Sequence, residues 1–135
     1  AFTPGTEAKT INTPWCNIGL SICYDLRFPE LYRTLTSLGA EILTVPSAFS
    51  VLTGESHWET LIRARAIENF CWVVAAAQVG NHPGRSTWGH SVIVNPWGEI
   101  VAEKIDGTGI IISDANLIKL RSLRQKFPSL NHRRI

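Results

Sequence analysis

One cysteine stands where a protein best displays a nucleophile. Cys23 follows a short apolar run at residues 17–22, typical of a buried strand, and precedes Pro29, which opens an amphipathic run that ends before Gly39. A sharp turn between a strand and a helix lifts a side chain clear of the sheet. Free peptide N–H groups at such a turn favour a thiolate, and that of Tyr24 is placed to bind an oxyanion. The position predicts thiol chemistry, although a free cysteine is more often a small buried residue.

Two histidines offer an alternative, a cysteine–histidine dyad of the papain type. His57 precedes a predicted helix and His90 begins a predicted strand, and nothing in the sequence places either beside Cys23. Cys16 and Cys71 lie in apolar, strand-like surroundings and are predicted to be core residues. Three cysteines without paired or metal-like spacing argue against a disulfide framework and a zinc site. We therefore expect no metal and no cofactor.

The composition is that of a globular protein. The chain has 135 residues, of which 44% are hydrophobic and 18% charged, with a formal net charge of +2. The basic residues are spread along the chain, so neither a nucleic-acid nor a membrane partner is expected. No apolar run has the length of a membrane span, and no signal peptide is evident. We expect a cytoplasmic protein, with a mitochondrial one as the alternative, and the start at Ala1 without any Met predicts a fragment.

The apolar patterns predict an α/β chain in which strands and helices alternate and a hairpin follows. Ser56 and Glu59 form a capping box at the start of the second helix, and Glu59 and Arg63 have helical spacing. The predicted helices cover residues 29–38, about 56–69 and 116–127. The predicted strands cover residues 17–22, 41–45, 71–78, 91–94, 100–103 and 109–113, with 71–78 buried on both faces, and loops are expected at 1–15, 46–54 and 80–85.

Several segments, in order along the chain, resemble the nitrilase family of carbon–nitrogen hydrolases. The longest reads GLSICYDLRFPEL and contains Cys23. Ordered motifs over nearly the whole chain are far more specific than one short pattern. The similarity is greatest to the Nit branch, whose members act on ω-amides such as deaminated glutathione. The matching segments are residues 19–31, 39–41, 46–49, 57–59, 63–69, 89–91 and 96–98.

The resemblance implies a fold, an assembly and a catalytic triad. Residues 1–135 would be the C-terminal portion of a single α/β/β/α sandwich domain, with residues 116–135 as its C-terminal helix and tail, and a homodimer or larger homo-oligomer is expected. The family's triad is Glu-Lys-Cys, with Cys23 here as the nucleophile and the Tyr24 N–H as an oxyanion donor. The family's Glu and Lys lie upstream of the cysteine. Glu7 and Lys9 do not match their motifs and are expected to be solvated loop residues.

The implied reaction is hydrolysis of a small linear amide with release of ammonia, and its partners are that amide and water. Arg27 is a candidate for binding a substrate carboxylate, with structural pairing as the alternative. Ser47, Ala48 and Phe49 follow a predicted parallel strand at its carboxyl end, where α/β proteins build their pockets.

Two further interpretations come from the same sequence. Arg63, Arg65 and Glu68 are predicted to pair with each other or with a neighbouring loop rather than to form an anion site. The alternative function is that of a catalytically incomplete fragment which serves only as a dimerising or interaction module.

Overall fold

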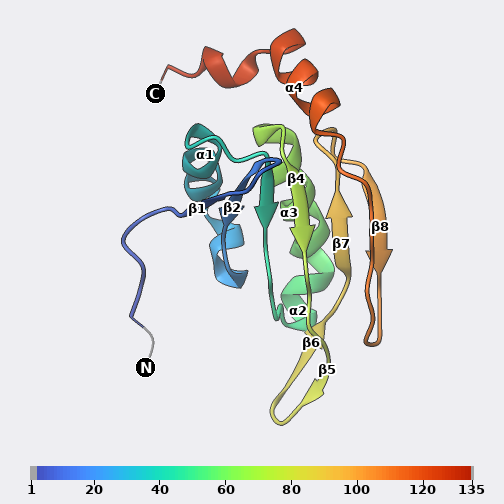
Figure 1. Ribbon diagram of the computed structural model, residues 1–135. Coiled ribbons are helices and arrows are strands. Elements are labelled where there is room, and N and C mark those ends of the chain that lie inside the picture. The colour runs from blue at the N-terminus through green and yellow to red at the C-terminus, as the bar shows by residue number, and fades with distance from the viewer. Residues whose placement is uncertain (1–2, 135) are drawn as a thin grey trace.

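A mixed six-stranded sheet organises the chain, which the computed structural model describes over residues 3–134 (Figure 1). Its strands, in spatial order, are β1 (Thr10–Asn12), β2 (Asn17–Leu20), β3 (Ile42–Thr44), β4 (Trp72–Ala75), β7 (Ser91–Val94) and β8 (Ile100–Lys104). β2, β3 and β4 are parallel, whereas the other neighbours pair antiparallel. β5 (Val79–His82) and β6 (Arg85–Trp88) form a separate hairpin. The predicted α/β class is confirmed.

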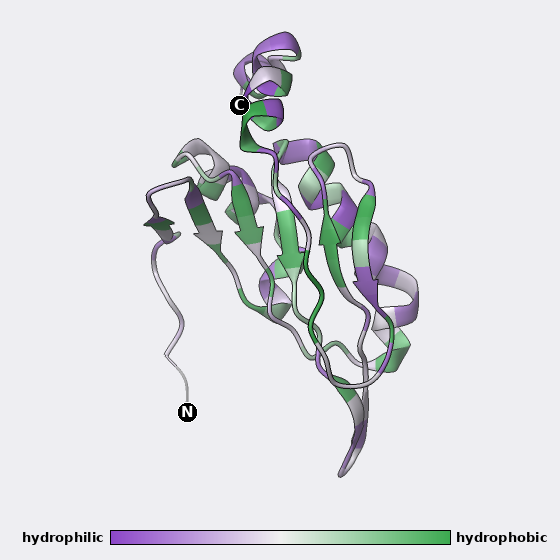
Figure 2. Cartoon of the chain, turned by 45° about the vertical axis from the view of Figure 1, so that its right-hand side comes forward, coloured by the Kyte–Doolittle hydropathy of each residue, from purple (hydrophilic) through white to green (hydrophobic). Residues whose placement is uncertain are grey.

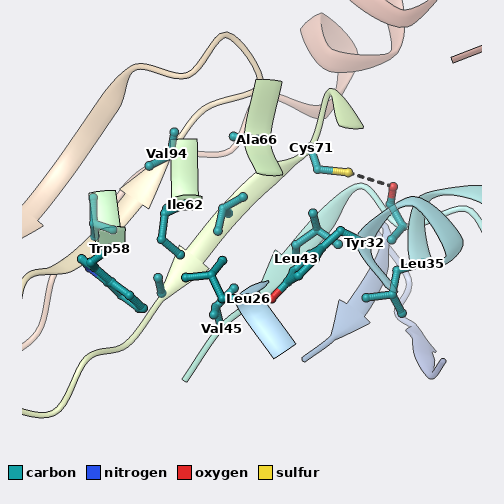
Figure 3. Packing of buried hydrophobic residues seen from close by; sticks show 14 of the residues in the cluster. Leu26, Tyr32, Leu35, Leu43, Val45, Trp58, Ile62, Ala66, Cys71 and Val94 are labelled. Atoms are coloured by element: carbon teal, nitrogen blue, oxygen red, sulfur yellow. Dashed lines mark hydrogen bonds between the residues drawn. The ribbon is translucent and has the colours of Figure 1, made fainter. Parts of the chain in front are cut away.

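Helices α1 (Pro29–Ser37) and α3 (Glu59–Asn69) cover one face of this sheet (Figure 1). Pro29 suits the first helical position because its missing N–H would have no partner there. Between helices and strands lies the main core, and the short 3₁₀ helix η1 (Cys23–Arg27) contributes Leu26 to it. The fully buried side chains of this core include Leu26, Tyr32, Leu35, Leu43, Val45, Ile62 and Val94 (Figure 3).

The helical region before β4 begins earlier than the sequence predicts. It comprises α2 (Val51–Thr53), the π-helical segment η2 (Gly54–Trp58) and α3. Ser50 caps the first turn, because its Oγ accepts a bond from the Thr53 N–H at 3.4 Å. The predicted capping box at Ser56 is therefore wrong, since Ser56 lies inside the helical run. The Glu59–Arg63 pair is confirmed at 3.2 Å.

Two predicted loops contain strands. Residues 1–15 were expected to be irregular, but β1 pairs antiparallel with β2 in register Thr10 to Gly19. In the segment 80–85, the turn falls at Pro83 and Gly84, and the residues on either side belong to β5 and β6. Both errors arise because pairing with the neighbouring strand, which the polar residues and turn signals of these short segments do not reveal, decides strand formation there.

Two predicted strands also differ. Residues 109–113 have strand-like composition, yet no strand is assigned there, and Ile110 and Ile112 are 87% and 85% exposed. The run 71–78 was expected to be buried on both faces, whereas Val74 of β4 is 39% exposed. By contrast the β7–β8 hairpin is confirmed, and its turn is closed by a 2.9 Å bond from the Gly98 N–H to the Asn95 carbonyl.

The opposite sheet face is only partly covered. Helix α4 (Leu117–Lys126) is capped by Asn116, as predicted, and precedes the 3₁₀ turn η3 (Ser129–His132). Its Leu120 packs on Trp72 and Ile93 in a small second core. Figure 2 shows the rest of this face without a helix in front of it, and Leu20 is 37% exposed there. Within residues 3–134 no helix is long and apolar enough to cross a membrane.

Shortening Leu43 to Ala will test the position of the main core. Leu43 is fully buried in the central strand β3, so the substitution leaves a cavity and lowers the free energy of unfolding by about 2–5 kcal/mol. The matched change Leu52→Ala, at a side chain that is 83% exposed, alters it by less than about 0.5 kcal/mol. Urea denaturation measures both, and equal losses would contradict the placement of Leu43.

Candidate active site

The three parallel strands end at one edge of the sheet, and their following residues meet there. Cys23 begins η1 after β2, and its N–H donates to the Pro46 carbonyl, which follows β3, at 2.9 Å. Ser47 in turn donates its N–H to the Ala76 carbonyl beyond β4 at 2.8 Å and accepts from the Gln78 N–H at 2.9 Å. Ligands of α/β proteins bind at such an edge. The fold therefore brings the predicted nucleophile beside the predicted pocket loop.

The backbone of Cys23 adopts a left-handed conformation, with φ of +46°. A residue with a Cβ atom adopts this region at a cost of about 1–2 kcal/mol, so the surroundings must hold it there. One restraint is Asp25, whose Oδ2 accepts a bond from the Ile22 N–H at 2.8 Å. Cys23 itself is half-buried. Among the described residues, the N–H of Tyr24 has no acceptor bonded to it, which suits the oxyanion role that the sequence predicts.

Arg27, at the end of η1, has defined neighbours. Its guanidinium lies over the Phe49 ring, with Cζ 5.4 Å from the ring centroid, and its Nη1 is 3.3 Å from Nδ1 of His57. The Phe49 ring also contacts Trp58, at a centroid distance of 5.0 Å. These contacts join four side chains, Arg27, Phe49, His57 and Trp58, which come from the end of η1, the segment after β3 and η2.

The histidines have partners other than the thiol. The His57 ring is bonded to Arg27, and the His90 ring stacks on Trp88 with centroids 4.2 Å apart and bonds the Trp88 carbonyl through Nδ1 at 3.1 Å. Neither contact involves Cys23. This arrangement gives the cysteine–histidine dyad no support.

Backbone contacts hold the predicted pocket loop, residues 46–49, and the residue after it. Ser47 bridges to Ala77, and Ser50 bridges to Thr87 of the β5–β6 hairpin. The Phe49 carbonyl accepts a 2.9 Å bond from the Trp88 N–H. Ser47 and Ala48 are half-buried, whereas Phe49 is buried. The segment that carries the predicted substrate-binding residues is therefore hydrogen-bonded to its neighbours through its backbone.

A buried polar group lies next to the turn that carries Cys23. The Ser21 hydroxyl donates to the Thr44 carbonyl at 2.8 Å, so the Tyr32 hydroxyl, 2.7 Å from Ser21 Oγ, is the donor in their shared bond. Burial raises the pKa of Tyr32 to about 12, which keeps the phenol protonated. These bonds join the last residues before Cys23 to β3 and α1.

Arg65 approaches the same turn from the other side. It is only 5% exposed, and its Nε and Nη2 both donate to the Leu26 carbonyl, at 3.2 and 2.7 Å. The predicted pair with Glu68 is confirmed at 3.0 Å. A contact with a neighbouring loop was one of the predicted alternatives, but the sequence did not identify η1 as the partner, although Arg65 lies three residues after Ile62 in the apolar stripe of its helix. A charge inside an apolar stripe is the signal that would have pointed to it.

The acidic and metal-ligating residues give no further site. Glu7 and Lys9 are exposed and contact each other, as expected for a solvated segment. In the part of the chain that the structure describes, no cluster of His, Cys, Asp and Glu has the arrangement of a metal site.

Comparison with known proteins identifies relatives. Residues 1–125 match the carbon–nitrogen hydrolase family. A human protein named deaminated glutathione amidase is 51% identical over 133 residues, which cover 97% of this chain and 41% of that protein. The chain thus spans less than half the length of this relative.

Solved structures agree with this assignment. The Caenorhabditis elegans NitFhit protein superposes with a TM-score of 0.93 at 48% identity, over 98% of this chain and 32% of that one. A mutant amidase from Nesterenkonia sp., with a TM-score of 0.70 and 32% identity over 77% of this chain and 40% of that one, carries the acetamide moiety of fluoroacetamide on its active-site cysteine. The predicted resemblance to the nitrilase family and its Nit branch is confirmed.

Exchange of Cys23 for glycine and for alanine will test its backbone conformation. At an ordinary position glycine is the less stable of the two by about 0.5–1 kcal/mol, because it loses more chain entropy on folding. At Cys23 the order reverses, with glycine more stable by about 1 kcal/mol, since it has no Cβ atom to strain at φ of +46°. The same pair at Cys16, where φ is not positive, serves as the control. Thermal unfolding reports both comparisons, and an identical order at the two sites would contradict the strain.

Proposed function

The chain belongs to the carbon–nitrogen hydrolase family, and we propose that it supplies the thiol nucleophile of an amidase that releases ammonia from a small linear amide. The observation that carries the proposal is Cys23 in a left-handed turn at the end of β2, bonded to the carbonyl of Pro46 at the same sheet edge. The covalent adduct on the cysteine of the Nesterenkonia amidase supports it further.

The proposed reaction proceeds through a thioester. The Cys23 sulfur, after losing its proton to a general base, forms a bond to the amide carbon, and the carbonyl oxygen becomes an oxyanion that accepts from the Tyr24 N–H. The C–N bond then breaks as the base returns the proton to nitrogen, and ammonia leaves. Water attacks the thioester, which gives the carboxylic acid and restores the thiol.

The base and the second oxyanion donor belong, by resemblance, to a glutamate and a lysine upstream of the cysteine. None of the 135 residues matches those motifs, and Glu7 and Lys9 are exposed and paired with each other. The proposal therefore assigns both roles to a preceding part of a longer protein. It does so because a thiol attack and an amine departure each need a proton acceptor or donor in reach.

The substrate we propose is an ω-amide with a carboxylate, such as deaminated glutathione. A guanidinium has five N–H donors, so the contact of Arg27 with His57 leaves others for a substrate carboxylate. Phe49, beneath the guanidinium, holds it by a cation–π contact. The name of the human relative supports this substrate class.

The open sheet face supports a further part of the proposal, that residues 1–135 are the C-terminal portion of one domain, with 116–135 as its C-terminal helix and tail. Apolar side chains such as Leu20 and Val74 are more than a third exposed on this face, and more polypeptide would bury them. The proposed assembly, by resemblance, is a homodimer. The same open face favours the second candidate function, a chain that acts only as a dimerising or interaction module.

Replacement of Cys23 by alanine, in the protein at its natural length, distinguishes these functions. For the amidase we expect loss of ammonia release to the background rate, and retained activity would refute the proposal. Iodoacetamide should label Cys23 at least about 10-fold faster than the half-buried Cys16 near pH 7. Cys71 should react only after unfolding, because it is buried and burial raises the pKa of its thiol. An interaction module predicts no preference for Cys23.

Replacement of Arg27 by leucine tests the substrate class. Loss of a charge-assisted bond to the carboxylate raises KM for an ω-amide by about 10- to 100-fold. A neutral linear amide of the same length is the matched control, and its kcat/KM should change by less than about 3-fold, since it has no charge for Arg27 to bind. Equal effects on the two substrates would show that Arg27 only supports the turn.

A further inference from the structure

The turn that carries Cys23, the 3₁₀ helix η1, is short and has few hydrogen bonds of its own. η1 spans Cys23–Arg27 and follows a residue with no side-chain cap, and Cys23 begins it with a positive φ. Such a conformation persists only where neighbouring groups fix it. Three ties hold the residues before Cys23 and the first turn, namely the Ser21 contacts with Thr44 and Tyr32, the bond from the Cys23 N–H to the Pro46 carbonyl, and the Asp25 cap. The end of the turn needs a separate restraint.

Arg65 supplies that restraint from α3. Two of its nitrogens donate to one acceptor, the Leu26 carbonyl, three residues after Cys23. Its guanidinium also lies over the Tyr32 ring, with Cζ 5.4 Å from the centroid (Tyr32 and Leu26 are labelled in Figure 3). Glu68 accepts from its Nη1 at 3.0 Å and neutralises the buried charge. Each of the three guanidinium nitrogens therefore has a protein partner.

The planar shape of the Arg65 guanidinium matters for its contact with the Leu26 carbonyl. A guanidinium is planar, so one plane can present two N–H groups to a carbonyl, a third to a carboxylate and a face to an aromatic ring. A lysine ammonium at the same place could bond to the carbonyl or to the carboxylate. It could not donate two bonds to the carbonyl and stack on the aromatic ring at the same time. The arrangement is thus specific to arginine and fixes the direction of the Leu26 carbonyl as well as its position.

We propose that Arg65 is a positioning residue for Cys23, which sets the direction of the thiol and of the Tyr24 N–H by fixing the end of η1. This inference rests on the proposed function of Cys23 as the nucleophile. A displaced turn misdirects the attacking sulfur, and for a neutral amide the accompanying shift of Arg27, which ends the same turn, matters little because such a substrate has no charge for Arg27 to bind. The loss therefore falls on kcat and on thiol reactivity, and KM changes little.

The experiment compares Arg65→Lys with Arg63→Lys in the protein at its natural length. Arg63 is a matched control on the same helix, because it too donates to a backbone carbonyl, that of Gly98 at 2.8 Å, and to a glutamate, Glu59, at 3.2 Å. It touches no part of η1 in these contacts. For Arg65→Lys we expect kcat for a small neutral linear amide to fall by about 10- to 100-fold, with KM within about 3-fold. For Arg63→Lys both should stay within about 3-fold.

A second readout needs no substrate. The rate of iodoacetamide labelling at Cys23, followed from pH 6 to about 9 by peptide mapping, should fall several-fold in Arg65→Lys and stay unchanged in Arg63→Lys. Thermal melting curves check that both variants are folded at the assay temperature. Glu68→Gln, which removes the carboxylate that orients Arg65, keeps the test decisive if Arg65→Lys does not fold, and it should shift kcat and labelling in the same direction.

Failure of this inference differs from failure of the proposed function. If the Arg65 and Arg63 variants have equal kcat and equal labelling profiles, Arg65 is only a structural residue and the inference is overturned. If Cys23→Ala retains amide hydrolysis, the nucleophile assignment itself fails, whatever Arg65 does.

Discussion

The parallel pairing of β2, β3 and β4 is the constraint on which the site depends. Parallel neighbours end at the same sheet edge, so residues from three distant parts of the sequence meet there without any need for long loops. The bond from the Cys23 N–H to the Pro46 carbonyl is a direct result, as is the link from Ser47 to the segment after β4. A slip of one residue in either pairing would turn the core-facing Leu43 outward and separate these contacts.

Polar groups inside the fold keep the strained turn in place while apolar packing supplies the bulk of the stability. Leu26 anchors η1 through its side chain in the core, whereas its carbonyl is bound by the guanidinium of Arg65. On the other side the phenol of Tyr32 reaches Ser21. Each of these buried polar groups has a partner, which is what makes their burial tolerable. The same packing layer thus both folds the chain and orients the turn that carries the thiol.

Local patterns predicted those features of the fold that local chemistry determines. Asn116 as a helix cap and the turn closed by Asn95 depend on neighbours within a few residues, and the structure confirms them. The predicted loop around β1 was wrong because its pairing with the neighbouring β2 outweighs the turn signals of this segment, and the predicted strand at 109–113 was wrong because no ladder partner meets it there. At the site, the position of Cys23 followed from its sequence context, whereas the contact of Arg65 with η1 depends on how α3 packs.

The π-helical segment Gly54–Trp58 makes the shape of the site sensitive to the number of residues in the chain at this point. A π turn holds an extra residue compared with an α turn, and each residue of an α-helix advances by about 100° around the axis. A relative with one residue fewer here would have a regular helix with α2 rotated against α3 and Ser50 carried away from its bridge to Thr87. Sequences that keep every motif residue but differ in length at this segment would then place Ser50 and the predicted pocket loop before it differently.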